Sequence, residues 1–146
     1  MLRKNPLSIV LLAGALALIL LSGFRPMAPQ GAEQEPSRLA VLWTSGDPEV
    51  ATKVAFMYTL SAKSQGWFDE VTLIIWGPSS KLLSENAELQ VEVAAMATAG
   101  VEVVACKACA DSYGVSEVLE GMGIEVKFMG QPLTEMLKGD WEVITF

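Results

Sequence analysis

Two cysteines, Cys106 and Cys109, are the strongest candidates for chemistry in this chain of 146 residues. The sequence contains no histidine, which excludes Ser-His-Asp and Cys-His catalysis, histidine-ligated zinc and an imidazole pH switch. The thiolate is the nucleophile in cysteine chemistry, and free thiols are mostly protonated at neutral pH. Activation of either cysteine must therefore come from its position in the fold.

The segment Cys106-Lys107-Ala108-Cys109 combines two thiols with a cation. We expect Cys106 to end a strand and begin a helix, where free backbone N–H groups and partial positive charge favour a thiolate. Lys107 adds positive charge, which Asp111 opposes. Cys109 lies about one helical turn after Cys106, close enough to resolve a disulfide or persulfide formed on it. Cys106 is therefore predicted to be the more reactive thiol.

Three other interpretations of the cysteine pair stay open. Free cysteine often behaves as a small hydrophobic residue, so the pair could be structural or inert. A thioredoxin-type redox site would normally place its C-x-x-C motif after the first strand, whereas this pair follows the third expected strand. A zinc site needs more ligands than two thiolates unless subunits pool them. We predict no metal and no cofactor.

Charge is unevenly distributed along the chain. The formal net charge is −7, with +2 in residues 1–38 and −9 in residues 39–146, where six lysines and no arginine face fifteen acidic residues. An acidic domain without arginine is a poor candidate for neutralising phosphates, so nucleic acid is not an expected partner. The apolar fraction of 51% excludes global disorder. Residues 39–146 are enough for one domain.

Residues 1–25 have the pattern of a signal anchor or signal peptide. Arg3 and Lys4 precede twenty uncharged residues, 5–24, which as a helix would span about 30 Å, one hydrocarbon core. We favour an uncleaved anchor, because the apolar run is long and no good cleavage site follows it. The positive charges would hold the N-terminus in the cytoplasm.

A flexible linker is expected over residues 26–38, which carry three prolines. The predicted localisation is the cytoplasmic membrane, crossed once, with the domain outside the cytoplasm. Cleavage of the segment would instead give a periplasmic or secreted domain.

Short apolar runs alternate with helical patterns over the rest of the chain. The expected strands are 39–43, 71–76, 101–105, 124–128 and 141–146, and the expected helices are 47–66, 79–99 with a break near Asn86, 109–113, 115–122 and 132–138. This alternation predicts an α/β fold with a mainly parallel five-stranded sheet covered on both faces. The loops that follow the strands should share one edge: Thr44–Asp47, Gly77–Ser80, Ala105–Ala110 and Gly130–Pro132.

The segment Ala105–Val115 resembles the cysteine segment of DsrE/DsrF-like sulfur-relay proteins. In that family a cysteine at the end of the third strand is followed eight residues later by glycine and an aliphatic residue, as Cys106 is by Gly114 and Val115. Thr44-Ser45-Gly46-Asp47 resembles the first strand-to-helix turn of the family. The resemblance covers nearly all of residues 39–146.

The resemblance implies a three-layer α/β/α sandwich and a function in sulfur transfer. Cys106 would hold sulfur as a persulfide, with Cys109 as a second thiol. The partners would be sulfur donor and acceptor proteins or small sulfur species, and the chain would be a sulfur carrier or sulfur transferase. Because the first 25 residues suggest export, we expect this chemistry at the outer side of the membrane and set tRNA thiolation aside. The rival function is a non-enzymatic oligomeric binding module with incidental cysteines.

The family also implies a homo-oligomer, a trimer or a multiple of it, with the cysteine near subunit contacts. Val115, Val118, Leu119 and Met122 recur at helical spacing and could cover the sheet or a partner. Trp67, Phe68 and Trp141 are bulky residues near expected element ends. We expect an interface between subunits to help shield Cys106, unless all these residues pack within one monomer.

Overall fold

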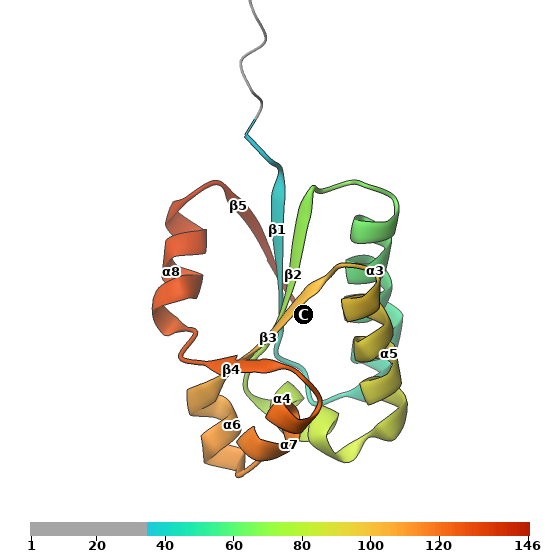
Figure 1. Ribbon diagram of the computed structural model, residues 1–146, viewed down its shortest axis with the longest axis vertical. Coiled ribbons are helices and arrows are strands. Elements are labelled where there is room, and N and C mark those ends of the chain that lie inside the picture. Colours follow the sequence, from blue (N-terminus) through green and yellow to red (C-terminus); the bar gives the residue numbers. More distant parts are fainter. Residues whose placement is uncertain (1–34) are drawn as a thin grey trace, which may run out of the picture. The chain divides into compact units, whose positions relative to one another are not determined.

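Five parallel strands form the centre of the computed structural model, which describes residues 35–146 (Figure 1). They are β1 (Arg38–Trp43), β2 (Glu70–Ile75), β3 (Glu102–Cys106), β4 (Glu125–Lys127) and β5 (Trp141–Thr145). Their order across the sheet is β4-β3-β2-β1-β5, and every neighbouring pair is parallel. The predicted five-stranded parallel sheet is therefore confirmed.

The predicted anchor, residues 1–25, and most of the predicted linker, residues 26–38, lie outside the described residues. Within residues 35–146, no helix has the length and apolar character needed to cross a membrane.

Eight helical segments connect the strands. They are α2 (Pro48–Val50), η1 (Ala51–Phe56), α3 (Met57–Ser64), α4 (Pro78–Glu85), α5 (Ala87–Thr98), α6 (Lys107–Tyr113), α7 (Ser116–Gly121) and α8 (Gly130–Lys138). Local caps set several of these bounds. The Asp47 carboxylate accepts a hydrogen bond from the Glu49 N–H at 2.8 Å, and Pro48 stands at the first helical position.

The caps also explain where the second helical region divides. The Asn86 side chain accepts hydrogen bonds from the backbone N–H groups of Glu88 and Leu89, each at 3.1 Å, and so starts α5 directly after α4 ends. The predicted break at Asn86 is confirmed. The first helical region differs from the uniform helix expected over 47–66, because its second segment, η1, has the wider π-helical turn.

Alternation along the strands sends side chains to two separate cores. One core lies against the helices that connect β1 to β4, and it contains Leu39, Val41, Trp43, Leu73 and Ile75 of the sheet. The other contains Ala40, Ile74, Val104 and Cys106, and Leu133 and Met136 of α8 pack against it. Figure 1 shows α8 on one side of the sheet and α3 and α5 on the other. The sheet is thus the middle of three layers.

The folded domain begins slightly before the expected boundary at residue 39. Ser37 donates to the Asp69 carboxylate from both its backbone N–H and its hydroxyl, each at 2.8 Å. These hydrogen bonds, the hydroxyl's first, hold the pKa of Asp69 below its usual value. Arg38 is already paired with Glu70 in the sheet. The prolines suggested a linker up to residue 38, but its last two residues are held by pairing with the start of β2.

The carboxyl ends of β1 and β2 are tied together by one buried hydroxyl. Ser79, which has no exposed surface, donates from Oγ to the Trp43 carbonyl at 2.6 Å and accepts from the Trp76 N–H at 3.0 Å. The Trp76 N–H lies 3.0 Å from the same Trp43 carbonyl. Ser79 therefore fixes the turn that leads from β2 into α4.

Removal of this hydroxyl should destabilise the domain. We expect Ser79→Ala to lower the free energy of unfolding by about 0.5–1.5 kcal/mol, because it removes the buried hydroxyl that bonds to both the Trp43 carbonyl and the Trp76 N–H. Urea denaturation followed by circular dichroism measures the change. The control is Ser64→Ala, at an exposed position at the end of α3, which should change stability by less than about 0.5 kcal/mol. Equal losses for the two variants would contradict the structural role of Ser79.

Candidate functional site

The strand connections diverge at the carboxyl ends of β3 and β4. The chain leaves β3 through α6 and α7, which contribute Ala110 and Leu119 to the core shared with α3 and α5. It leaves β4 through α8, on the opposite face. In open α/β sheets, ligands bind at the edge where neighbouring connections part to opposite faces, because the divergence leaves a crevice there. The topology therefore points to the edge between β3 and β4.

Cys106 is the last residue of β3 and the N-cap of α6. Its side chain is 3% exposed and packs with Ile74, Val104 and Met129. Because side chains alternate along a strand, Cys106 and Val104 share the face that α8 covers. The predicted position of Cys106 at a strand-to-helix junction is confirmed by these bounds.

Cys109 lies in the first turn of α6 and is half-buried, close to the Cys106 side chain and to the backbone N–H of Gly77. Burial raises the pKa of Cys109, and its contact with Cys106 acts in the same direction, while the Gly77 N–H opposes them. Both cysteines are free thiols in this structure.

Two glycines hold the elements that bring the thiols together. Gly77, between β2 and α4, has a φ of +72°, a conformation that other residues rarely adopt. It turns the chain so that its N–H reaches Cys109. Gly114 has a φ of +68° and ends α6, where its N–H bonds to the Asp111 carbonyl at 3.0 Å. The end of the cysteine segment at Gly114 and the neighbouring turn at Gly77 are thus both set by backbone conformations that favour glycine.

The cation beside Cys106 is paired with a carboxylate. Lys107 Nζ lies 3.0 Å from Asp111 Oδ1, and Ser116 Oγ donates to the same oxygen. The Ser116 hydroxyl, followed by Lys107, holds the pKa of Asp111 below its usual value. Lys107 therefore points its charge at Asp111 on the surface of α6, and it does not line the cavity described next.

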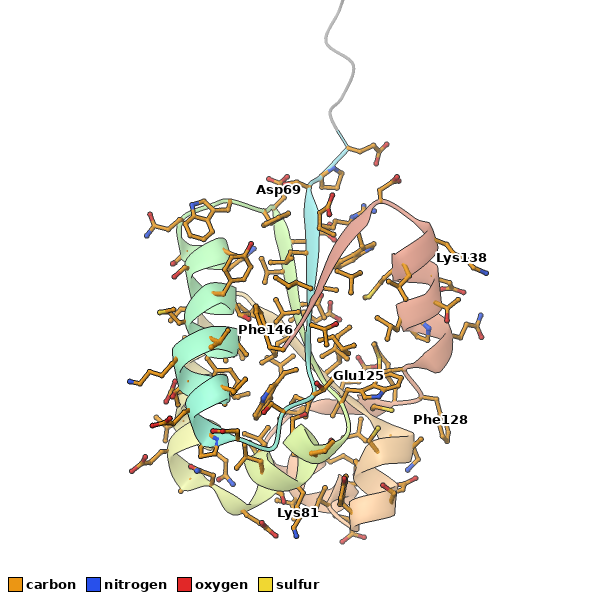
Figure 2. The ribbon with its side chains drawn as sticks, turned by 180° about the vertical axis from the view of Figure 1, so that it is seen from behind. Asp69, Lys81, Glu125, Phe128, Lys138 and Phe146 are labelled. Carbon is orange, nitrogen blue, oxygen red and sulfur yellow. The ribbon has the colours of Figure 1, made fainter. Side chains whose placement is uncertain are left out.

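An open cavity of about 530 Å³ lies between the cysteine segment and the start of α8. Cys106 and Cys109 line one side, and the loop from Phe128 to Pro132 lines the other, with Trp76 beside the thiols. Phe128 is 67% exposed, and Figure 2 shows it projecting outward between α8 and α6. The volume suits a small molecule or the tip of a peptide loop.

The cavity is mainly apolar and carries no positive charge. Its one ionisable carboxylate belongs to Glu135 of α8, which accepts a hydrogen bond from the Gln131 amide at 2.9 Å. Its lining contains no lysine or arginine. Within the described part of the chain, no three side chains of Cys, Asp and Glu come close enough to hold a metal ion. The chemistry available in the cavity is therefore that of the two thiols.

Two of the four loops expected at one edge line this cavity. Ala105–Ala110 carries both thiols and Gly130–Pro132 faces them, whereas no residue of Gly77–Ser80 lines the cavity. Thr44–Asp47 does not line it. Gly46 instead lines a separate hollow of about 290 Å³ with Lys81 and Tyr113.

Sequence analysis did not identify the other cavity residues, Trp76, Phe128, Met129 and Glu135. The sequence could have indicated Trp76 and Phe128 as cavity residues, because each directly follows a strand and so lies at the same edge of the sheet. Glu135 gave no such signal, because its place in the cavity depends on the path of α8 across the sheet.

The two thiols should differ in reactivity. The Cys106→Ser variant keeps only Cys109, whose alkylation should titrate above the usual thiol pKa, because burial disfavours its thiolate. The Cys109→Ser variant keeps Cys106, which we expect to be alkylated faster at neutral pH because of its place at the start of α6. Rates of iodoacetamide alkylation against pH, measured on both variants, test this order. Faster reaction of Cys109 at neutral pH would reverse the assignment of roles.

Comparison with known proteins agrees with this arrangement. Residues 37–146 match the model of the DsrE/DsrF-like family. A solved structure of a conserved protein of unknown function from Bacteroides thetaiotaomicron is 32% identical, with a TM-score of 0.74 over 80% of this chain and 100% of that one. The ychN protein from E. coli shares the fold at 16% identity, with a TM-score of 0.60 over 75% of this chain and 99% of that one. No curated protein sequence matches significantly. The chain therefore belongs to the DsrE/DsrF-like family.

Proposed function

We propose that this chain is a sulfur carrier or thiol-redox protein that holds sulfur as a persulfide on Cys106, with Cys109 as its second thiol. The observation that carries the proposal is the pair of free thiols on one side of an open cavity. Membership of the DsrE/DsrF-like family is compatible with sulfur relay. Sulfur donors and acceptors, proteins or small sulfur species, would reach the thiols through the cavity.

The surroundings of Cys106 suit a persulfide. Its sulfur is buried among Ile74, Val104 and Met129, yet it also lines the cavity. A sulfur atom added to it would enter an apolar space of about 530 Å³. Soft, polarisable sulfur is well accommodated beside methionine and aromatic side chains, here Met129 and Trp76.

Treatment with a sulfur donor tests the proposal directly. After incubation with inorganic polysulfide and desalting, we expect intact mass spectrometry to show one added sulfur atom per chain. The sulfur should be removed by a thiol reductant and should map to the peptide that contains Cys106. Cys106→Ser should take up none, because the remaining Cys109 has a raised pKa and little thiolate at neutral pH.

The rival function gives a different result in the same experiment. A non-enzymatic binding module with incidental cysteines would form no adduct on either cysteine with any sulfur donor. Uptake of sulfur by Cys106→Ser, with none by Cys109→Ser, would instead place the carrier role on Cys109.

We further propose that the domain forms a homotrimer, or a multiple of it, with contacts at the mouth of the cavity. The single chain already buries Cys106, so subunit contacts are not required to shield this sulfur. Leu119 is buried within the domain, and Val115 and Met122 pack against the same core, whereas Val118 is 47% exposed. The exposed aromatic ring at the mouth, Phe128, supports an interface there.

Light scattering of residues 33–146 tests the assembly. We expect a trimer mass or a multiple of it at micromolar concentration, and a shift of Phe128→Glu toward the monomer, because a carboxylate would be desolvated in an apolar contact. Val91→Glu, a change at another exposed apolar side chain on α5, is the control and should leave the mass unchanged. A monomer at high micromolar concentration in the unchanged protein would contradict the proposal.

For localisation, we propose that residues 1–25 hold the domain at the outer side of the cytoplasmic membrane, with a periplasmic or secreted domain as the alternative after cleavage. The support is the charge pattern of Arg3 and Lys4 before the uncharged run 5–24. Membrane fractionation of a C-terminally tagged chain distinguishes the two.

A further inference from the structure

We propose that Cys109 attacks the inner sulfur of the Cys106 persulfide, so that the chain releases hydrosulfide and is left with a Cys106–Cys109 disulfide. This step rests on the proposed function, because it begins from sulfur held on Cys106. It makes the chain a sulfide-releasing protein as well as a carrier. The substrate class is sulfane sulfur, and the product is hydrosulfide.

The contact between the two thiols determines which sulfur is attacked. Cys109 lies in the first turn of the helix that Cys106 begins, and both side chains line the same cavity; the Cys106 sulfur becomes the inner sulfur of the persulfide. The added outer sulfur has room on the cavity side. Cys109 is thus already placed against the atom whose attack closes a disulfide, three residues along the same short helix. Such pre-positioning replaces an encounter in solution by a step within one molecule.

The atoms and electrons of the step balance without an added oxidant. The Cys109 thiolate forms a bond to Cys106 Sγ, and the bond from Cys106 Sγ to the outer sulfur breaks. The outer sulfur leaves as hydrosulfide, taking the bonding electron pair and keeping the persulfide proton. The sulfane sulfur is reduced, and the two cysteine sulfurs are oxidised to the disulfide. A dithiol reductant must then open the disulfide before another cycle.

The groups around Cys109 control when the step occurs. The Gly77 N–H, from the turn between β2 and α4, stabilises the Cys109 thiolate, while burial and Cys106 at the end of β3 raise its pKa. Glu135 of α8 also lines this cavity, and the Lys107–Asp111 pair lies on α6 itself. Because burial raises the pKa of Cys109, its thiolate fraction is small at neutral pH, and release is slower there than at higher pH. Release should quicken by about tenfold per pH unit below that pKa, as the thiolate fraction rises.

Sulfide release from the full chain tests the inference. The reduced protein is loaded with inorganic polysulfide, desalted and held without reductant, while intact mass and free sulfide are followed with time. We expect the unchanged chain to lose the added sulfur, release one sulfide per chain and end two hydrogen atoms lighter than the reduced form. Cys109→Ser and Cys109→Ala should hold the persulfide at least about 10-fold longer, because the neighbouring nucleophile is gone.

The outcomes separate this inference from the proposed carrier function. If the unchanged chain and both Cys109 variants load sulfur and hold it equally long, Cys109 does not resolve the persulfide and the carrier function stands. If sulfur is lost without disulfide formation, the inference also fails. If neither the unchanged chain nor the Cys109 variants load any sulfur, the carrier function itself fails. A release rate that does not rise with pH would contradict attack by the Cys109 thiolate.

Discussion

The connection from β4 to β5 is the constraint on which the rest of the site depends. β5 pairs with β1, at the opposite edge of the sheet from β4. The chain must therefore cross one whole face of the sheet, and α8 makes that crossing on the face that the earlier helices leave uncovered. Because the connections after β3 and β4 part to opposite faces, a gap opens between their carboxyl ends. The cavity that contains both thiols occupies that gap.

The Cys106 side chain is buried and yet lines the cavity, because Cys106 lies at the end of a strand. The strand alternation buries its side chain under α8, among the same residues that stabilise the sheet. The strand ends there, so the sulfur also meets the cavity at the edge. Cys109 reaches the same space from the first turn of α6. The two thiols at the cavity thus belong to residues that also contribute to the core.

Few charged side chains lie around the cavity at the carboxyl end of β3. Lys107, which follows Cys106 in the chain, is paired with Asp111, and the cavity lining carries Glu135 as its ionisable carboxylate. Small anions such as sulfite or thiosulfate would find no positive charge on this lining. The lining instead offers the apolar side chains of Trp76 and Met129, which can contact soft sulfur atoms.

The sequence alone determined the features that depend on near neighbours: the five strands, the cap at Asp47, the break at Asn86, and the position of Cys106 at a strand end. These follow from side-chain period and local hydrogen bonds, which act over a few residues. Only the tertiary structure decided that Cys106 faces α8, that Gly77 contacts Cys109, and that Phe128 and Glu135 line the cavity. Each of these depends on strand order and on the path of α8, which are set by pairing between residues far apart in the chain and leave no local pattern.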